Sequence, residues 1–286
     1  MDDDRRLRRQ RNVEIFLDTM IECSRDPYLA ESIMETNRNK KLILEGDVLS
    51  AGMPPERAGQ AQVIVSGRRS FEAARRYAGK KVCVLNFASA TGPGGGVRHG
   101  SSAQEESLCR CSTLYPSLAS QDMWDAFYAP HREAGSRLYN DDIIYCPGVV
   151  VFKSDDSHPQ MLPRGEWYKV DVLTCAAPNL RHFDECDPDE ARGLMNGGLE
   201  KLLEKRIRRI FEAALCQGAE VLVLGAFGCG AFRNPPDLVA SVFRRVVEGY
   251  GGHFETIEFA VFHMGSETAN YNAFRGAFAD MAQIPA

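Results

Sequence analysis

Residues Gln104, Glu105 and Glu106 are the side chains best suited to chemistry, because an amide and two acids follow closely on a run of glycines. Two acids can divide proton transfer and ligand binding between them when burial and nearby charge raise the pKa of one. Neighbouring helical residues point about 100° apart, so the two carboxylates should not flank one bond as a retaining glycosidase pair does. One acid should donate a proton while the other binds a ligand. In isolation, the triplet would instead indicate a helix first turn, where acids complement the helix dipole.

The loop before this triplet is suited to binding an anion. Four glycines, at positions 92, 94, 95 and 96, allow the backbone to adopt φ > 0 and to approach a ligand closely. The loop connects an apolar run at 82–88 to a helical stretch at about 102–114, whose N–H groups and dipole favour a diphosphate. Val97 stands where a P-loop needs Lys and a dinucleotide-binding motif needs Gly, so neither a nucleoside triphosphatase nor a dehydrogenase is indicated. We call residues 92–100 the first glycine loop.

The spacing of these motifs resembles that of a known enzyme family. Three glycines, seven residues and the Gln-Glu-Glu triplet are spaced as in the signature of poly(ADP-ribose) glycohydrolases, and the flanking LNFASATGPGGG and AQEESLCRCSTLYPSL resemble its microbial branch. The resemblance implies that Glu106 protonates the leaving ribose oxygen, that Glu105 holds ribose hydroxyls and that Gln104 supports the site. It also implies that part of the first glycine loop approaches the diphosphate, namely Gly94, Gly95, Gly96 and Val97.

The end of the apolar run at 82–88 departs from the macrodomain pattern at one position. Many macrodomains carry a second Asn three residues after the first, whereas this chain has Asn86 followed by Ser89. We expect both residues to bind substrate, with the Ser89 hydroxyl donating a hydrogen bond in place of the amide.

A second buried strand runs into another loop, residues 225–232, which we call the second glycine loop. Alone, it would indicate a tight strand-to-helix turn, but paired with the first loop it predicts the second wall of a diphosphate cleft. The resemblance implies that Phe232 packs against the distal ribose. Cys229 should be a small filler and not a nucleophile, since no histidine lies near it in sequence. The resemblance also implies that backbone amides come from Gly228, Cys229, Gly230 and Ala231.

Other candidate positions rest on weaker signals. The family stacks an aromatic residue on adenine near the last strand, which makes Phe262 a candidate, although core packing would explain both Phe259 and Phe262. Lys153 is expected to be a solvated surface lysine and not a phosphate ligand. Asp47 resembles the adenine-binding aspartate of macrodomains, but the segment correctly placed before strand 82–88 is 66–68, so we assign Asp47 no role.

Strands alternating with helices are expected to position these loops. This order predicts an α/β fold, which the resemblance specifies as a three-layer α/β/α macrodomain with a mixed central sheet. We expect a helical N-terminal extension, residues 1–60, and a macrodomain-like catalytic domain, residues 61–286. The expected strands are 62–66, 82–88, 143–145, 149–152, 170–176, 221–225 and 257–262, and the expected helices are 12–35, 70–78, 102–114, 189–217, 238–247 and 270–281.

Details of some elements are also predicted. Ser70 is a candidate N-cap for the helix at 70–78. Pro147-Gly148 should separate the two short strands around it. The mixed-charge start of the chain, MDDDRRLRRQRN, should be frayed or solvated.

Composition narrows the class of protein. The 286 residues carry a formal net charge of −5, so no bulk basic field attracts nucleic acid. No apolar run approaches a membrane span or a secretory signal, and no histidine or cysteine pattern indicates a metal site. Nine cysteines, an odd number without a C-x-x-C pair, favour free thiols in a reducing cytosol or nucleus. We expect a monomer that needs neither metal nor organic cofactor.

Three functions are compatible with these features. The preferred one is hydrolysis of ribose–ribose O-glycosidic bonds in poly(ADP-ribose), on the free polymer or on ADP-ribosylated protein, with ADP-ribose as product and Glu106 as general acid and then base. A non-catalytic ADP-ribose reader would keep the glycine cleft and lose the acid, whereas both acids are present here. A hydrolase of single ADP-ribosyl groups would share the cleft.

Overall fold

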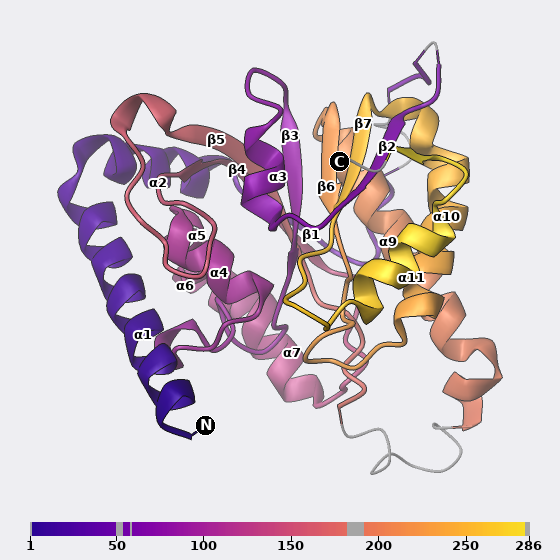
Figure 1. Cartoon of the computed structure of the whole chain (residues 1–286), viewed down its shortest axis with the longest axis horizontal. Helices are drawn as coiled ribbons and strands as arrows, with labels where there is room; N and C mark the ends of the chain where they lie inside the picture. The colour runs from indigo at the N-terminus through magenta and orange to yellow at the C-terminus, as the bar shows by residue number, and fades with distance from the viewer. Residues whose placement is uncertain (1, 50–53, 58, 182–191, 284–286) are drawn as a thin grey trace.

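The apolar runs of the sequence form the strands of one sheet. The computed structural model describes residues 2–49, 54–57, 59–181 and 192–283. In this part of the chain, eight strands are arranged in the order β1-β4-β5-β3-β6-β7-β2-β8 (Figure 1). The strands are β1 (Lys41–Ile43), β2 (Gln62–Ser66), β3 (Val82–Phe87), β4 (Ile143–Val151), β5 (Tyr168–Cys175), β6 (Val221–Leu224), β7 (Thr256–Ala260) and β8 (Ala282–Gln283).

The sheet is mixed because β4 runs against both of its neighbours, while every other adjacent pair is parallel. The sequence predicted two short strands separated by Pro147-Gly148, and this was wrong: both belong to β4. The register with β5 shifts between Cys146 and Val149, and Gly148 has φ +65°. A β-bulge therefore absorbs the proline and glycine without ending the strand.

Helices cover both faces of the sheet, and α2 packs against β4. Short 3-10 turns occur at Val97–His99, Arg164–Glu166 and Gly251–His253, and π-helical turns occur at Trp124–Tyr128 and Leu194–Gly198. The α-helices are α1 (Asp2–Arg25), α2 (Pro27–Asn39), α3 (Ser70–Arg75), α4 (Gln104–Cys111), α5 (Leu114–Leu118), α6 (Gln121–Met123), α7 (Ala129–Ala134), α9 (Leu199–Cys216), α10 (Pro236–Tyr250) and α11 (Ala269–Ala277).

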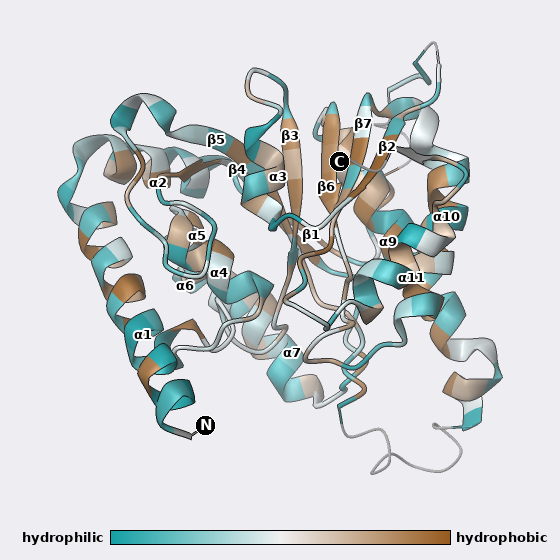
Figure 2. Cartoon of the chain, viewed as in Figure 1, coloured by the Kyte–Doolittle hydropathy of each residue, from teal (hydrophilic) through white to brown (hydrophobic). Residues whose placement is uncertain are grey.

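Side chains of the central strand β3 point alternately to the two faces of the sheet, and each face carries its own hydrophobic cluster. Val82 and Val84 pack with residues of α3 and α4, whereas Cys83 and Leu85 pack with residues of α9 and α10. Successive side chains of a strand point to opposite faces, so a continuous apolar run implies a strand covered on both sides. Figure 2 shows this hydrophobic centre in β3 and β6, with hydrophilic residues on the outer parts of the helices.

The N-terminal residues form two helices rather than one. Asp26 caps α2 by accepting hydrogen bonds from the backbone N–H of Tyr28 and Leu29, and Pro27 occupies the first helical position. The charged head is solvated, as expected, because residues 3–11 are exposed, and it is helical because α1 begins at Asp2. Ser70 lies inside α3 and is not its N-cap, which is Arg69.

These two helices pack against the remainder of the chain. Cys23 of α1 and Leu29 of α2 share a small core with Val150 and Phe152, and β1 continues the sheet beside β4. A division of the chain at residue 60 stays a prediction.

Two further properties concern helix hydrophobicity and the cysteines of the described residues. No helix of the described segments is long and apolar enough to cross a bilayer. The eight cysteines that the structure describes are free thiols, and Cys186 lies outside the described residues.

Candidate active site

Gln104 joins the start of α4 to the end of β3. Its Oε1 accepts a hydrogen bond from the backbone N–H of Phe87 at 2.9 Å, and its Nε2 donates to the carbonyl of Leu85 at 2.7 Å and to Ser70 Oγ at 3.0 Å. The strand end, the helix start and α3 therefore meet at one amide. This arrangement fixes the direction in which the next two side chains leave the helix.

Glu105 is a buried acceptor. Its side chain accepts hydrogen bonds from the backbone N–H of Ser89 at 2.7 Å and from Asn86 Nδ2 at 3.3 Å. The pKa of Glu105 is raised to about 8, chiefly by burial. The charge of Glu106 also raises this pKa, while the hydrogen bonds from Ser89, Asn86 and the backbone of Gly94 offset part of the increase. The Asn86 and Ser89 contacts thus converge on Glu105.

Glu106 is held by one of its two oxygens. Its Oε1 accepts a hydrogen bond from the backbone N–H of Gly96 at 2.9 Å. Its Oε2 is buried and has no hydrogen-bond partner within the described ranges. Buried polar atoms are almost always paired, so an oriented carboxyl oxygen without a partner is available to a ligand or a transferring proton.

The first glycine loop folds back over both carboxylates. A Cβ atom on Gly95 would lie 2.7 Å from Glu106 Oε1 and 3.0 Å from Glu105 Oε2, and Gly95 has φ +56°. Glycine is therefore required at this position by both space and conformation. The backbone N–H groups of Gly95 and Val97 donate to carbonyls within the loop, that of Gly96 to Glu106 and that of Gly94 to Glu105.

The second glycine loop is tightly held at one residue and open at another. A Cβ on Gly228 would lie 2.5 Å from Ala177 Cβ and from Asn234 Nδ2, whereas one on Gly230 would meet nothing within 4 Å. The N–H groups of Gly230 and Ala231 have no hydrogen-bond partner in the described part of the chain. They are thus free to donate to an anion.

A cavity of about 260 Å³ lies between the carboxyl ends of β3, β6 and β7. Its lining brings together Gln104, from the Gln-Glu-Glu triplet, and four residues of the second glycine loop: Gly228, Gly230, Ala231 and Phe232. Glu105, Glu106, Asn86, Ser89 and residues 94–97 lie beside the cavity and do not line it, and Cys229 does not line it either. The carboxyl ends of parallel strands are where open α/β sheets bind ligands.

Comparisons with known proteins agree with this geometry. The family model "Microbial-type PARG, catalytic domain" matches residues 19–154. The poly(ADP-ribose) glycohydrolase of Thermomonospora curvata is 32% identical, with a TM-score of 0.82 over 93% of this chain and 99% of that chain. The chain belongs to the microbial-type poly(ADP-ribose) glycohydrolase family.

Other solved members of the family have been captured with ligands. The glycohydrolase of Deinococcus radiodurans in complex with ADP-ribose is 34% identical, with a TM-score of 0.77 over 88% of this chain and 98% of that chain. The Thermomonospora curvata enzyme bound to the inhibitor ADP-HPD has a TM-score of 0.79 at 32% identity, over 93% of this chain and 99% of that chain. No curated protein matches the chain. The predicted three-layer α/β/α macrodomain fold is confirmed.

The far end of the cavity in this glycohydrolase contains two residues that sequence reasoning missed. The guanidinium of Arg69 lies 4.0 Å from the ring centroid of Phe262. Asp155 is 9% exposed, and its Oδ2 accepts a hydrogen bond from the backbone N–H of Phe71 at 2.9 Å. Burial raises the pKa of Asp155, and its Oδ1 has no hydrogen-bond partner in the described segments. No spacing signal in the sequence related Asp155 to the glycine loops that form the cavity.

Phe262 and Phe259 have different environments. Phe259 is fully buried in the core, as predicted, but Phe262 is 42% exposed and lines the cavity, so core packing was the wrong expectation for it. Asp47 accepts a hydrogen bond from the backbone N–H of Leu44 and does not line the cavity.

Two single-residue expectations had opposite outcomes. Burial raises the pKa of Cys229 to about 12, which agrees with an unreactive filler. Lys153 was expected to be a solvated surface lysine, but its side chain is 3% exposed. Its Nζ donates to Asp18 Oδ2 at 2.7 Å and to Thr19 Oγ1 at 2.8 Å. Lys153 therefore anchors α1, and no pattern in the residues around it indicated that α1 would cover it.

The arrangement of potential metal ligands can be followed in the described ranges. No group of three His, Cys, Asp or Glu side chains in the described ranges is arranged to hold a metal ion.

Proposed function

We propose that this chain hydrolyses ribose–ribose O-glycosidic bonds of poly(ADP-ribose) and releases ADP-ribose. The observation that carries the proposal is the buried Oε2 of Glu106, which lacks a partner among the described residues while Oε1 is fixed by the first glycine loop. A general acid needs an oriented oxygen that is not already bonded to a protein group, and Oε2 of Glu106 meets this condition among the described residues. Membership of the glycohydrolase family, and the ligands bound to its solved members, support this substrate class.

The reaction uses Glu106 twice. The protonated Oε2 donates its proton to the leaving ribose oxygen as the glycosidic C–O bond breaks and an oxocarbenium-like ribose forms. The resulting Glu106 carboxylate then removes a proton from water, whose oxygen bonds to the anomeric carbon. The products are ADP-ribose and a polymer shortened by one unit, and Glu106 regains its proton. Neither metal nor organic cofactor takes part.

Glu105 binds substrate in this proposal and does not transfer the proton. Its carboxyl oxygens would accept hydrogen bonds from ribose hydroxyls in place of its present contacts with Asn86 and Ser89. Gln104 acts on the substrate indirectly, through the hydrogen bonds that set the start of α4.

The diphosphate is assigned chiefly to the second glycine loop. Gly230 and Ala231 line the cavity, and their N–H groups have no partners in the described part of the chain, whereas the N–H groups of residues 94–97 are bonded inside the protein. The first loop would then shape the cleft while the second donates hydrogen bonds. Phe232 would pack against the distal ribose, whose anomeric carbon forms the scissile bond.

The base would occupy the far end of the cavity. There the adenine ring can stack on Phe262, and its exocyclic amine can donate to the unpaired Oδ1 of Asp155.

The cysteines bear on the cellular setting. Free thiols among the described cysteines favour a reducing compartment, cytoplasmic or nuclear, and we propose that the protein acts as a monomer on polymer or on ADP-ribosylated protein.

The test is incubation of purified protein with automodified, poly(ADP-ribosyl)ated protein, with products separated by chromatography. The wild type should release ADP-ribose, whereas Glu106→Gln should not, because it lacks the transferable proton. The same variant should bind ADP-ribose within about tenfold of wild type, since shape and hydrogen bonding are conserved.

Other outcomes would overturn specific parts of the proposal. Full activity of Glu106→Gln would remove the acid assignment. Polymer binding without release by the wild type would make the protein a reader. Release from a singly modified target but not from polymer would make it a mono-ADP-ribosyl hydrolase.

A further inference from the structure

Two residues with an unusual backbone conformation lie beside Phe232. In the described part of the chain, the two non-glycine residues with positive φ are Tyr139, at +56°, and Arg233, at +58°. Arg233 follows Phe232 directly, and the ring of Tyr139 lies 6.1 Å from that of Phe232, centroid to centroid. Side chains other than glycine rarely adopt this conformation, and it persists where surrounding contacts enforce it, often at functional sites.

A buried guanidinium enforces the conformation of Tyr139. Arg206 of α9 is fully buried, and its Nε contacts Asp141 Oδ1 at 2.6 Å. Its Nη2 donates to the carbonyl of Tyr139 at 3.2 Å, and its Nη1 donates to the carbonyl of Ala176 at 2.8 Å. One side chain therefore fixes both the Tyr139 segment and the chain just beyond β5, where Ala177 faces the second glycine loop.

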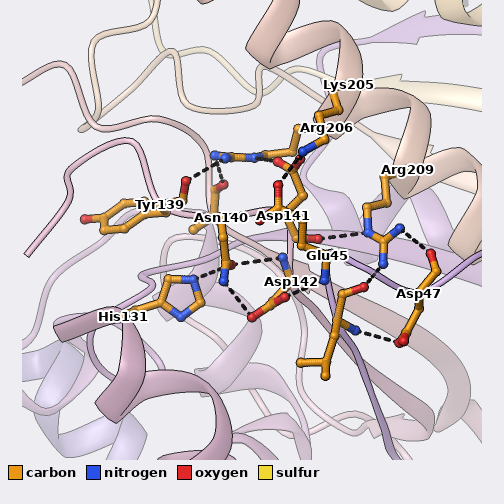
Figure 3. A network of polar contacts seen from close by, with 12 residues as sticks. Glu45, Asp47, His131, Tyr139, Asn140, Asp141, Asp142, Lys205, Arg206 and Arg209 are labelled. Atoms are coloured by element: carbon orange, nitrogen blue, oxygen red, sulfur yellow. Dashed lines mark hydrogen bonds and ion pairs between the residues drawn. The ribbon is translucent and has the colours of Figure 1, made fainter. Parts of the chain in front are cut away.

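The residues after Tyr139 are held equally firmly. Asn140 Oδ1 contacts His131 Nε2 at 2.7 Å, and Asn140 Nδ2 donates to Asp142 Oδ2 at 2.8 Å. Asp142 Oδ1 accepts from the backbone N–H of Glu45 at 2.7 Å. Figure 3 shows these contacts around the backbone of the segment, while the ring of Tyr139 points away from Arg206 and lies 6.0 Å from the ring of His131, centroid to centroid.

The side chain of Tyr139 is directed towards the second glycine loop. Besides the ring contact with Phe232, its hydroxyl accepts a hydrogen bond from Asn179 Nδ2 at 3.5 Å. The next residue, Leu180, donates its backbone N–H to the carbonyl of Phe232 at 2.9 Å. Tyr139 thus contacts both Phe232 and the segment that holds Phe232 in place.

We propose that Tyr139 is a positioning residue that holds the Phe232 ring against the distal ribose, at the scissile bond. The inference rests on the proposed function, because it assigns Phe232 to that ribose. The Arg206–Asp141 pair keeps the Tyr139 backbone in its strained conformation, so that the ring backs Phe232 before substrate arrives. Pre-formed walls of this kind favour catalysis because the reacting groups are already aligned.

The test is a double-mutant cycle with Tyr139→Asn and Phe232→Leu. Asn tolerates positive φ, so Tyr139→Asn removes the ring without adding backbone strain. It should lower kcat about tenfold while ADP-ribose affinity falls about threefold, since misplaced reacting groups affect the transition state most. In the Phe232→Leu background, the same change should cost less than about twofold, because residues that act through one another are not additive.

Two further variants separate positioning from general destabilisation. Tyr139→Phe keeps the ring and should retain nearly full kcat. Leu138→Ala alters the adjacent residue, which packs against the core under α9 and α10, and should lower Tm without a matching loss of kcat. Wild-type kcat in Tyr139→Asn, full additivity with Phe232→Leu, or an equal kcat loss in Leu138→Ala would overturn the proposal.

The cycle also distinguishes this inference from the proposed function. If the wild type binds ADP-ribose without turnover, the hydrolase proposal fails, and the four proteins of the cycle are compared by ADP-ribose affinity. A roughly threefold loss that is present with Phe232 and absent in the Phe232→Leu background supports Tyr139 positioning Phe232 in a binding site. A loss of equal size in both backgrounds, or none, contradicts it.

Discussion

The two glycine loops look alike in sequence, because each follows a buried strand and each contains closely spaced glycines, yet the structure gives them different environments. In the first loop, the N–H groups of residues 94–97 are bonded inside the protein and the backbone is pressed against two carboxylates. In the second loop, Gly230 faces open space and the N–H groups of Gly230 and Ala231 lack partners in the described segments. The first loop is therefore built to hold the acids, and the second to receive the anion.

The supports behind the loops differ as well. The first loop is backed by α1, since Asn12 Nδ2 donates to the carbonyl of Gly100 at 3.0 Å and a side chain on Gly100 would collide with the carbonyl of Arg9. The second loop is backed by residues 176–180 and by Arg206 of α9. The same local pattern thus depends on opposite ends of the chain.

The largest effect is expected from Gly95→Ala. The added Cβ would lie within 3.0 Å of an oxygen of each carboxylate, and alanine is strained at φ +56°. We expect kcat to fall by about a hundredfold or more, because the acid is displaced from its productive position. Steady-state kinetics on polymer would measure this, and a variant with normal kcat would show that the first loop does not set the acid.

A smaller effect, on affinity and not on the acid, is expected from Gly230→Val. The side chain would meet no protein atom within 4 Å at its Cβ, so the protein should fold, but it would fill the space beside the free N–H groups. Calorimetry should find ADP-ribose binding weakened about tenfold, in proportion to the loss of one or two charge-assisted hydrogen bonds. Gly165→Val, at an equally open glycine outside the cavity, is the control and should bind normally.

The support from α1 predicts a modest effect. Asn12→Ala removes the hydrogen bond to Gly100 and leaves a buried carbonyl unpaired, which costs about 1–3 kcal/mol of stability. Thermal unfolding should show a lower Tm, and kcat should fall about two- to threefold because the first loop loosens. Asn39→Ala, whose amide donates to Glu35 within α2, is the matched control. Equal kcat losses in the two variants would argue against any special link between α1 and the loop.

The smallest effect is a pH trend in the stability of Glu105→Gln. Burial raises the pKa of Glu105 in the folded protein to about 8, from an ordinary value of 4.5. The wild type therefore has its full stability below about pH 4.5 and loses some as pH rises through about 8, because the buried carboxylate must ionise. Glutamine does not titrate, so Tm of the variant minus Tm of wild type should increase between about pH 5 and pH 9. A constant difference would contradict the raised pKa.

Local sequence patterns were sufficient for much of the fold and for the carboxylate motif. The strands β2, β3, β5, β6 and β7 coincide closely with apolar runs, because a strand covered on both faces must be apolar throughout. The pairing of a glycine run with the Gln-Glu-Glu triplet located the start of α4. The structure describes the contacts of the predicted site residues. Their roles in binding and catalysis stay predictions.

Features that depend on distant contacts were not predictable in this way. Lys153 is buried because α1, far away in sequence, covers it. Asp155 lines the cavity and is held there by a hydrogen bond from the backbone N–H of Phe71, which is also distant in sequence. Strand β4 is continuous because it pairs with β5 on both sides of its bulge. The local signal of Pro147 and Gly148 does not indicate this pairing. The local sequence around Phe262 resembles a core strand, and only the tertiary structure shows that its ring lines the cavity.

The free cysteines bear on how the protein should respond to chemical stress. Burial raises the pKa of seven of the eight described thiols, leaving few thiolates at neutral pH. Peroxides and alkylating agents react with thiolates, and the proposed mechanism uses carboxylates alone. Hydrolysis of the polymer should therefore continue under oxidising conditions that inactivate enzymes with a nucleophilic cysteine.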